Sequence, residues 1–162
     1  MSFSVILPTL NENGHIIKLI EEISKIFNSN KKDFEIIVVD DNSNDGTYES
    51  VKKYQTNNSY LKVILRKDKK KNLANSINDG IIHSKYENII WMDADFQHPP
   101  KYIKDFILKC ENFDVVISSR FLQESRRYFN NSSLEKEINE NQSYIFNKLC
   151  RKILFEDITD YT

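Results

Sequence analysis

The chain has 162 residues, of which 40% are hydrophobic and 29% are charged, so it is long enough for one compact domain with a substantial core. Its 23 Lys and Arg residues against 24 Asp and Glu residues leave a formal net charge of -1, which excludes an overall basic field, and we expect no nucleic-acid partner. Two cysteines are too few for a disulfide framework and favour a reducing compartment, and no segment has the ~20 consecutive apolar residues of a membrane span.

Apolar runs alternate with helically spaced segments along most of the chain, as in a parallel sheet covered by helices on both faces. In the helix expected over residues 72–84, Leu73, Ile77 and Ile81 share one face. Trp91 and Met92 are interpreted as core residues of a strand. In chain order, the predicted strands are residues 3–7, closed by Pro8, then 34–39, 61–65, 88–92 and 113–119, and the predicted helices are 15–27, 47–54, 72–84, one opened by Pro99 and Pro100, and 143–154, the last preceded by a polar loop over 124–141.

Polar side chains follow three of these strands. Ligands bind at the carboxyl ends of the strands in open α/β sheets, so we expect these side chains to line one site. Carboxylates that meet there repel one another unless a cation or hydrogen-bond donors compensate. The polar side chains are those of Asn11 and Glu12 after the first strand, Asp40 and Asp41 after the second, and Asp93 and Asp95 after the fourth.

The spacing Asp93-x-Asp95 is typical of a half-filled site for Mg²⁺ or Mn²⁺. These cations prefer carboxylate oxygens, take only one or two protein carboxylates, and complete their shell with water and phosphate oxygens. The alternative is that the acidic pairs only cap helices and form turns. No glycine-rich phosphate loop follows any predicted strand, which disfavours classical dinucleotide binding and P-loop hydrolysis.

Four segments, taken in order, resemble the motifs of family 2 glycosyltransferases, and most closely those of dolichol-phosphate mannosyltransferases and bacterial polyprenyl-phosphate glycosyltransferases. The resemblance implies one GT-A catalytic domain with a Rossmann-like, mostly parallel sheet. It also implies inverting transfer of a hexose, of the mannose or glucose type, from a GDP- or UDP-linked sugar to a polyprenyl phosphate, by a protein in peripheral contact with the cytoplasmic face of a membrane. The segments are Pro8-Thr-Leu-Asn11-Glu12, Ile36-Ile-Val-Val-Asp40-Asp41-Asn-Ser43-Asn-Asp45-Gly46-Thr47, Met92-Asp93-Ala-Asp95-Phe-Gln97-His98-Pro99-Pro100 and Ser119-Arg120.

The resemblance also implies roles for individual residues. A metal ion held by Asp93 and Asp95 would stabilise the charge that develops on the departing nucleoside diphosphate. A phosphate monoester is already anionic at neutral pH, so it needs no protein base to act as a nucleophile. It does need positive charge beside it, and the guanidinium of arginine supplies that charge together with two parallel N–H donors. The implied sets are Asp95, Gln97 and Arg120 for catalysis; Pro8, Asn11, Glu12, Val39, Asp40, Asp41, Asp93 and Gln97 for the nucleotide sugar; and Arg120, Arg126, Arg127 and Ser143 for the acceptor phosphate.

The sequence departs from the family pattern in two places. Asn139 stands where the family has an arginine four residues before Ser143, and the glycine-rich stretch near residue 72 keeps only Gly80. The chain also stops at Thr162 where relatives continue, so we expect a catalytic domain over residues 1–162 that is truncated at its C-terminal end.

Two other functions stay open at this point. A family 2 transferase with a hydroxyl acceptor would need a general base, because a protonated alcohol is a weak nucleophile, and Asp157 or Asp160 would be the candidate. An incomplete nucleotide-binding module without transfer activity would account for the early end and the missing arginine.

Overall fold

The computed structural model describes residues 1–67 and 70–118. The chain divides into two compact units, Met1–Glu111 and Asn112–Thr162. Every described helix and strand lies in the first unit, and the predicted loop over 124–141 and helix over 143–154 lie outside the described residues. The strands are β1 (Ser2–Thr9), β2 (Asp33–Asp40), β3 (Leu61–Leu65) and β4 (Asn88–Trp91), and the helices are α1 (Ile16–Ser29), α2 (Thr47–Gln55), α3 (Leu73–Ile82), the 3₁₀ turn η1 (Pro100–Tyr102) and α4 (Ile103–Lys109).

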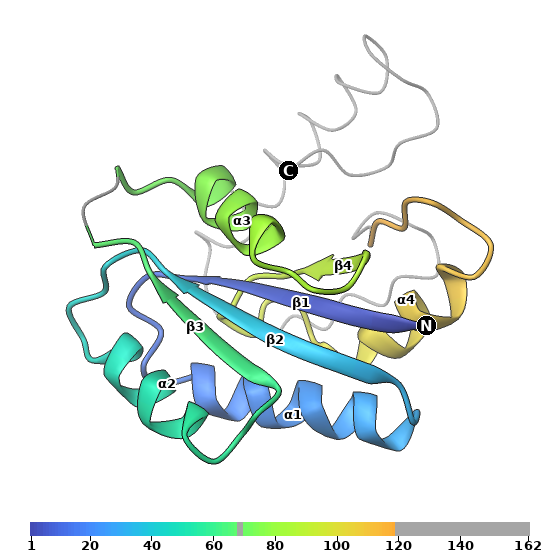
Figure 1. The fold of residues 1–162 in the computed structure, drawn as a ribbon, viewed down its shortest axis with the longest axis horizontal. Coiled ribbons are helices and arrows are strands. Elements are labelled where there is room, and N and C mark those ends of the chain that lie inside the picture. Colours follow the sequence, from blue (N-terminus) through green and yellow to red (C-terminus); the bar gives the residue numbers. More distant parts are fainter. Residues whose placement is uncertain (68–69, 119–162) are drawn as a thin grey trace, which may run out of the picture. The chain divides into compact units, whose positions relative to one another are not determined.

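The four strands form one parallel sheet in the order β3-β2-β1-β4 (Figure 1). The chain adds β2 and β3 on one side of β1 and then crosses back to place β4 on the other side. This reversal of strand order creates a switch point beside the carboxyl end of β1, which is where open α/β sheets bind their ligands. The loops that follow β1, β2 and β4 therefore reach the same edge of the sheet.

Helices cover both faces of the sheet, as predicted (Figure 1). Alternate side chains of β1 point to opposite faces, because successive residues of a strand do so. Val5 and Leu7 pack with α1, α2 and α4 in the larger apolar cluster. Ile6 packs with Ile37 and Val39 in a smaller cluster on the other face, the face that α3 covers.

Small residues let α3 approach the sheet closely. A Cβ atom at Gly80 would lie 2.5 Å from Cγ2 of Ile6, so only glycine fits there without rearrangement. Ser76 and Gly80 are the buried residues of this helix, whereas the side chains of Leu73 and Ile81 are 52% and 46% exposed. The predicted helix is therefore present, and it turns its small residues to the sheet while Leu73 and Ile81 stay exposed.

The first strand is longer than the sequence indicates, because β1 continues past Pro8 to Thr9. Ile6 O accepts the N–H of Met92 on the β4 side, and Thr9 O accepts the N–H of Asp41 on the β2 side. Pro8 has the same orientation as Ile6, so its nitrogen faces the side on which β4 has already ended. The missing N–H of proline costs no ladder hydrogen bond at that position.

The fifth strand predicted over residues 113–119 is not present over residues 113–118. A strand requires a partner for its backbone groups, and no described residue pairs with this segment or with the second edge of β4. Trp91 in β4 is 51% exposed, contrary to the prediction that it is a core residue, whereas Met92 is buried as predicted.

Candidate functional site

Hydrogen bonds join the loop after β1 to the loop after β2. Each loop contains an asparagine in the left-handed conformation, Asn11 (φ 62°) after β1 and Asn42 (φ 59°) after β2, which asparagine tolerates better than most residues. The hydrogen bonds hold the two loops together at the carboxyl edge of the sheet. The bonds run from Asn11 N–H to Ser43 Oγ (2.8 Å), from Asn44 N–H to Asn11 Oδ1 (3.0 Å), from Glu12 N–H to Thr47 Oγ1 (2.9 Å) and from Asn13 N–H to Asp45 Oδ2 (3.0 Å).

Two acidic residues accept hydrogen bonds that hold these loops in place. Asp40 is fully buried, and its carboxylate accepts hydrogen bonds from the hydroxyl of Thr9 (3.1 Å) and from the N–H (2.9 Å) and hydroxyl (2.6 Å) of Ser43. Asp45 is exposed. Its burial is slight and would raise its pKa, but hydrogen bonds from the hydroxyl of Thr47 and the N–H groups of Asn13 and Thr47 lower that pKa below the usual value.

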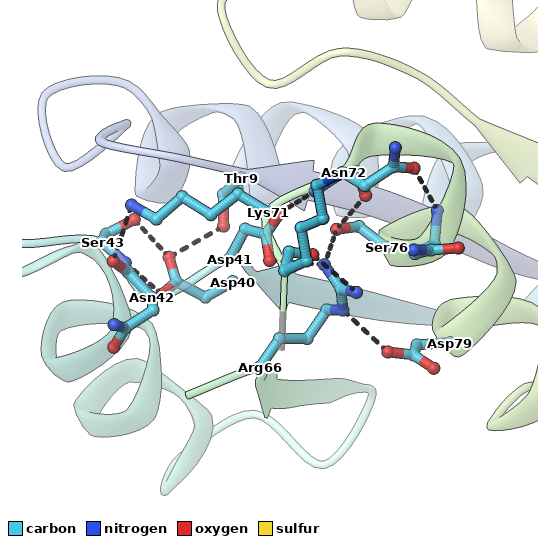
Figure 2. Close-up of polar contacts among 12 residues, drawn as sticks. Thr9, Asp40, Asp41, Asn42, Ser43, Arg66, Lys71, Asn72, Ser76 and Asp79 are labelled. Atoms are coloured by element: carbon cyan, nitrogen blue, oxygen red, sulfur yellow. Dashed lines mark hydrogen bonds and ion pairs between the residues drawn. The ribbon is translucent and has the colours of Figure 1, made fainter. Parts of the chain in front are cut away.

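Asp41 belongs to a buried network built around Arg66, which directly follows β3 (Figure 2). Arg66 is 3% exposed, and its guanidinium pairs with the carboxylate of Asp41 and, through Nε at 2.8 Å, with that of Asp79 in α3. It also donates to the hydroxyl of Ser76 (3.0 Å), while the N–H of Asn72 donates to Asp41 Oδ2 (2.8 Å). The network fixes the orientation of the Asp41 carboxylate and attaches it to the start of α3.

Arg66 is the functional candidate that sequence reasoning missed. A signal was present, because Arg66 is the one arginine before residue 120 in a lysine-rich chain, and it stands directly after a predicted strand. Arginine suits a buried site with two carboxylates better than lysine does, since its planar guanidinium can donate in several directions at once.

A second group of carboxylates lies at the switch point. The pKa of Glu12 is raised above its usual 4.5, first by burial and then by the negative charge of Asp95, with smaller contributions of the same sign from Asp45 and Asp93. His15 opposes the shift. The loops after β2 and β4 therefore bring three acidic side chains within electrostatic reach of Glu12 in the loop after β1.

The turn after β4 carries the predicted metal ligands. Asp93 Oδ2 lies 3.4 Å from Nδ1 of His98, and Asp95 Oδ1 accepts the N–H of Gln97 at 2.9 Å. Within residues 1–67 and 70–118, no three His, Cys, Asp or Glu side chains converge closely enough to hold a metal ion by themselves. Two hard carboxylate ligands beside an excess of negative charge fit Mg²⁺ or Mn²⁺, because such an ion takes its other ligands from water and phosphate.

Three of the remaining predicted site residues lie in the described part of the chain, and the others do not. Pro8 and Val39 are neighbours across β1 and β2 and are both buried beneath the loops. Gln97 is exposed on the turn that carries Asp95. The predicted acceptor residues and alternative bases lie outside the described residues; they are Arg120, Arg126, Arg127, Ser143, Asp157 and Asp160.

Comparison with known proteins identifies relatives of this sequence. The sequence model described as glycosyl transferase family 2 matches residues 4–162. A dolichol-phosphate mannosyltransferase from Pyrococcus furiosus is 34% identical over 124 residues, which are 76% of this chain and 34% of that protein. The chain thus spans about a third of the length of this relative.

Solved structures share the fold. A glucosyl-3-phosphoglycerate synthase from Mycobacterium tuberculosis in complex with UDP superposes with a TM-score of 0.60 over 98% of this chain and 55% of its own, at 17% identity. The mannosyltransferase PcManGT from Pyrobaculum calidifontis, solved with GDP-Man and Mn²⁺, has a TM-score of 0.50 and 29% identity over 57% of this chain and 27% of its own. These similarities and the parallel sheet with helices on both faces identify the fold as GT-A.

Proposed function

The chain belongs to glycosyl transferase family 2, and on that premise we propose that it transfers a hexose from a nucleoside diphosphate sugar to a polyprenyl phosphate, with inversion. The observation that carries the proposal is the gathering of Glu12, Asp93 and Asp95 at the switch point of the sheet. Carboxylates that act on one another's charge are costly to bring together, so the negative charge of Asp93 and Asp95 near Glu12 at a ligand-binding edge favours a cationic partner there.

Asp93 and Asp95 are the proposed ligands of Mg²⁺ or Mn²⁺. When bound, such an ion would neutralise the charge that develops on the departing nucleoside diphosphate. The mannosyltransferase from Pyrobaculum calidifontis was solved with both GDP-Man and Mn²⁺, which supports the same use of metal here. Gln97 contributes its N–H, which orients the Asp95 carboxylate, and the charges of Asp93 and Asp95 act on Glu12 in the loop after β1.

The nucleoside of the donor is proposed to lie over the loops after β1 and β2. Asp41 presents a carboxylate already oriented by Arg66 and by the N–H of Asn72, and its remaining lone pairs can accept hydrogen bonds from a base or a ribose. Pro8 and Val39 form the apolar floor beneath this region. Asp40 and Asn11 have an indirect role, because their side chains hold together the loops on which the nucleoside is proposed to lie.

The acceptor follows from the relatives and from chemistry. The relative from Pyrococcus furiosus is named a dolichol-phosphate mannosyltransferase, and a lipid phosphate is a nucleophile that requires no protein base. Arg120, Arg126, Arg127 and Ser143 are proposed to bind that phosphate, with the protein in peripheral contact with the cytoplasmic face of a membrane. None of the described helices combines the length and apolar character that crossing a bilayer requires.

A transfer assay tests the proposal. The full chain is incubated with polyprenyl phosphate, Mn²⁺ and either GDP-[¹⁴C]mannose or UDP-[¹⁴C]glucose, and labelled lipid is extracted. We expect labelled lipid with one donor, and loss of about 100-fold or more in Asp95→Ala, since the metal site would lose one of its two carboxylates. Asp105→Ala, which removes an exposed carboxylate from the first turn of α4, is the matched control and keeps the parent activity.

Two results would contradict the proposal. Donor binding without labelled lipid would indicate a nucleotide-binding module. Transfer to a hydroxyl acceptor that is abolished by Asp157→Asn or Asp160→Asn would indicate the chemistry that needs a general base.

A further inference from the structure

The backbone at Phe96 has an unusual conformation. Its φ is 62°, in the left-handed region that residues with a bulky side chain rarely adopt, at a cost of roughly 1–2 kcal/mol. Asp95 Oδ1 accepts the N–H of Gln97 at 2.9 Å, so Phe96 is the middle residue of a turn closed by the side chain of a proposed metal ligand. Strain of this kind persists only where the surroundings overdetermine the conformation.

The side chains of this turn alternate between the core and the ligand edge. Ala94 is 3% exposed and belongs to the larger apolar cluster, and Phe96 packs against the same cluster. Asp93 and Asp95, the alternate residues, carry charges that act on Glu12. The two apolar side chains therefore anchor the turn, and the two acidic ones are left at the ligand edge.

The ring of Phe96 contacts the beginning of α1. Its centroid lies 6.3 Å from that of the His15 ring in an edge-to-face arrangement, and Nζ of Lys18 lies 5.5 Å from it. The carbonyl of Glu12 accepts the N–H groups of His15 and Ile16, both at 3.0 Å, and so opens the same helix. The ring thus joins the turn that carries Asp95 to the helix start that carries Glu12.

We propose that Phe96 is a positioning residue for the cation site: its ring holds the turn of Asp93 and Asp95 against the start of α1 and thereby fixes the position of their carboxylates. This inference rests on the proposed function, because it takes Asp93 and Asp95 as the ligands. Residues that orient metal ligands from outside the first shell change metal affinity by about 10–100-fold when they are removed.

The test measures Mn²⁺ binding to the full chain, with Mn²⁺ alone, from the electron paramagnetic resonance signal of the free ion. Phe96→Ala is expected to weaken Mn²⁺ affinity by about tenfold or more, and Phe96→Leu to restore most of it, because leucine refills the apolar contact. Phe96→Gly, which removes the backbone strain together with the ring, should weaken affinity as alanine does. Tyr102→Ala removes another aromatic ring, 40% exposed in η1, and is the control that keeps the parent affinity.

A second measurement needs no metal. Amide hydrogen exchange of the metal-free protein should become faster at Gln97 in Phe96→Ala, because the turn loses its anchor, and stay unchanged in the central strand β1. Parent-like Mn²⁺ affinity in Phe96→Ala, or parent-like affinity in Phe96→Gly, overturns the inference.

Asp95→Ala separates the two proposals. If Asp95→Ala weakens Mn²⁺ binding and Phe96→Ala does not, the metal site stands and the role of Phe96 fails. If Asp95→Ala also binds Mn²⁺ as the parent does, the proposed metal site fails and the inference fails with it.

Discussion

At the scale of single residues, the most expensive feature of the site is the buried guanidinium of Arg66. Burying a charge costs several kcal/mol, which is recovered only when partners satisfy it well. Here the carboxylates of Asp41 and Asp79 and the hydroxyl of Ser76 surround it. The network holds the Asp41 carboxylate in one orientation, so this carboxylate is already in place at the proposed donor site before a ligand binds.

Replacing Arg66 should therefore lower the free energy of unfolding. Arg66→Met removes the guanidinium that pairs with the buried carboxylate of Asp41, and we expect the free energy of unfolding to fall by about 3–5 kcal/mol in urea titrations. Lys67→Met removes an exposed neighbouring charge and should change it by less than about 0.5 kcal/mol. An equal effect of the two substitutions would contradict this account of the network.

Glu12 gives a pH dependence whose sign follows from its raised pKa. Burial and the charge of Asp95 raise this pKa above 4.5, so the folded chain binds the proton more tightly than the unfolded chain. The free energy of unfolding then falls as the pH rises from 4.5 through the raised pKa, because ionised Glu12 is disfavoured in the folded state.

Glu12→Gln should consequently stabilise the metal-free protein near neutral pH. Denaturation curves at about pH 7 are expected to show a larger free energy of unfolding for Glu12→Gln than for the parent, and the difference should become small at about pH 4, where most of Glu12 is protonated in both states. A difference that is the same at both pH values would show that the ionisation of Glu12 is not its cause.

The sequence identified the acidic residues of the site because strand ends can be read from apolar runs, and those ends must meet at one edge. It did not indicate how each carboxylate is used. Asp40 and Asp41 are compensated by internal donors, whereas the charges of Asp93 and Asp95 act on Glu12. That division depends on Ser43 and Arg66, which contact the carboxylates only after the chain has folded.

At the scale of elements, the apolar spacing predicts where helices and strands occur better than it predicts what they contact. The segment around α3 is helical as expected, but Ser76 and Gly80 face the sheet in place of Leu73 and Ile81. A periodicity argument selects the buried face of a helix by its large apolar residues. The helix can approach the sheet most closely, however, on the face that carries its smallest side chains. Pro8 shows the same limit, since its acceptability in β1 depends on where β4 ends.

The close approach of α3 makes Gly80→Ala a sharp test of this packing. Alanine favours a helix over glycine by about 1 kcal/mol, but the new Cβ would lie 2.5 Å from Cγ2 of Ile6. We expect a net loss of about 1–3 kcal/mol in the free energy of unfolding. Asn78→Ala, on an exposed position of the same helix, is the control and should be neutral or stabilising.

The double variant Ile6→Ala with Gly80→Ala identifies the cause. Removing Cγ2 of Ile6 removes the clash, so the cost of Gly80→Ala should shrink in that background. Full additivity of the two substitutions would contradict the proposed contact.

At the scale of the whole molecule, strand order positions the chemistry. The parallel sheet with helices on both faces follows from alternating strand and helix patterns, and this part of the prediction is confirmed. The order β3-β2-β1-β4 could not be read from the sequence alone, because apolar runs do not specify which strands are neighbours. The predicted strand over 113–119 is absent over residues 113–118 for a related reason, since an apolar run does not supply a pairing partner.

The central claim is that carboxylates brought together by this strand order bind a divalent cation together with a nucleoside diphosphate. Isothermal titration calorimetry with GDP and with UDP, each with and without Mn²⁺, tests it most directly. The account predicts that Mn²⁺ strengthens the binding of one nucleotide by about tenfold or more, and that Asp95→Ala removes this gain while Asp105→Ala keeps it. Nucleotide affinity that is the same with and without Mn²⁺, or a gain that survives Asp95→Ala, would contradict it.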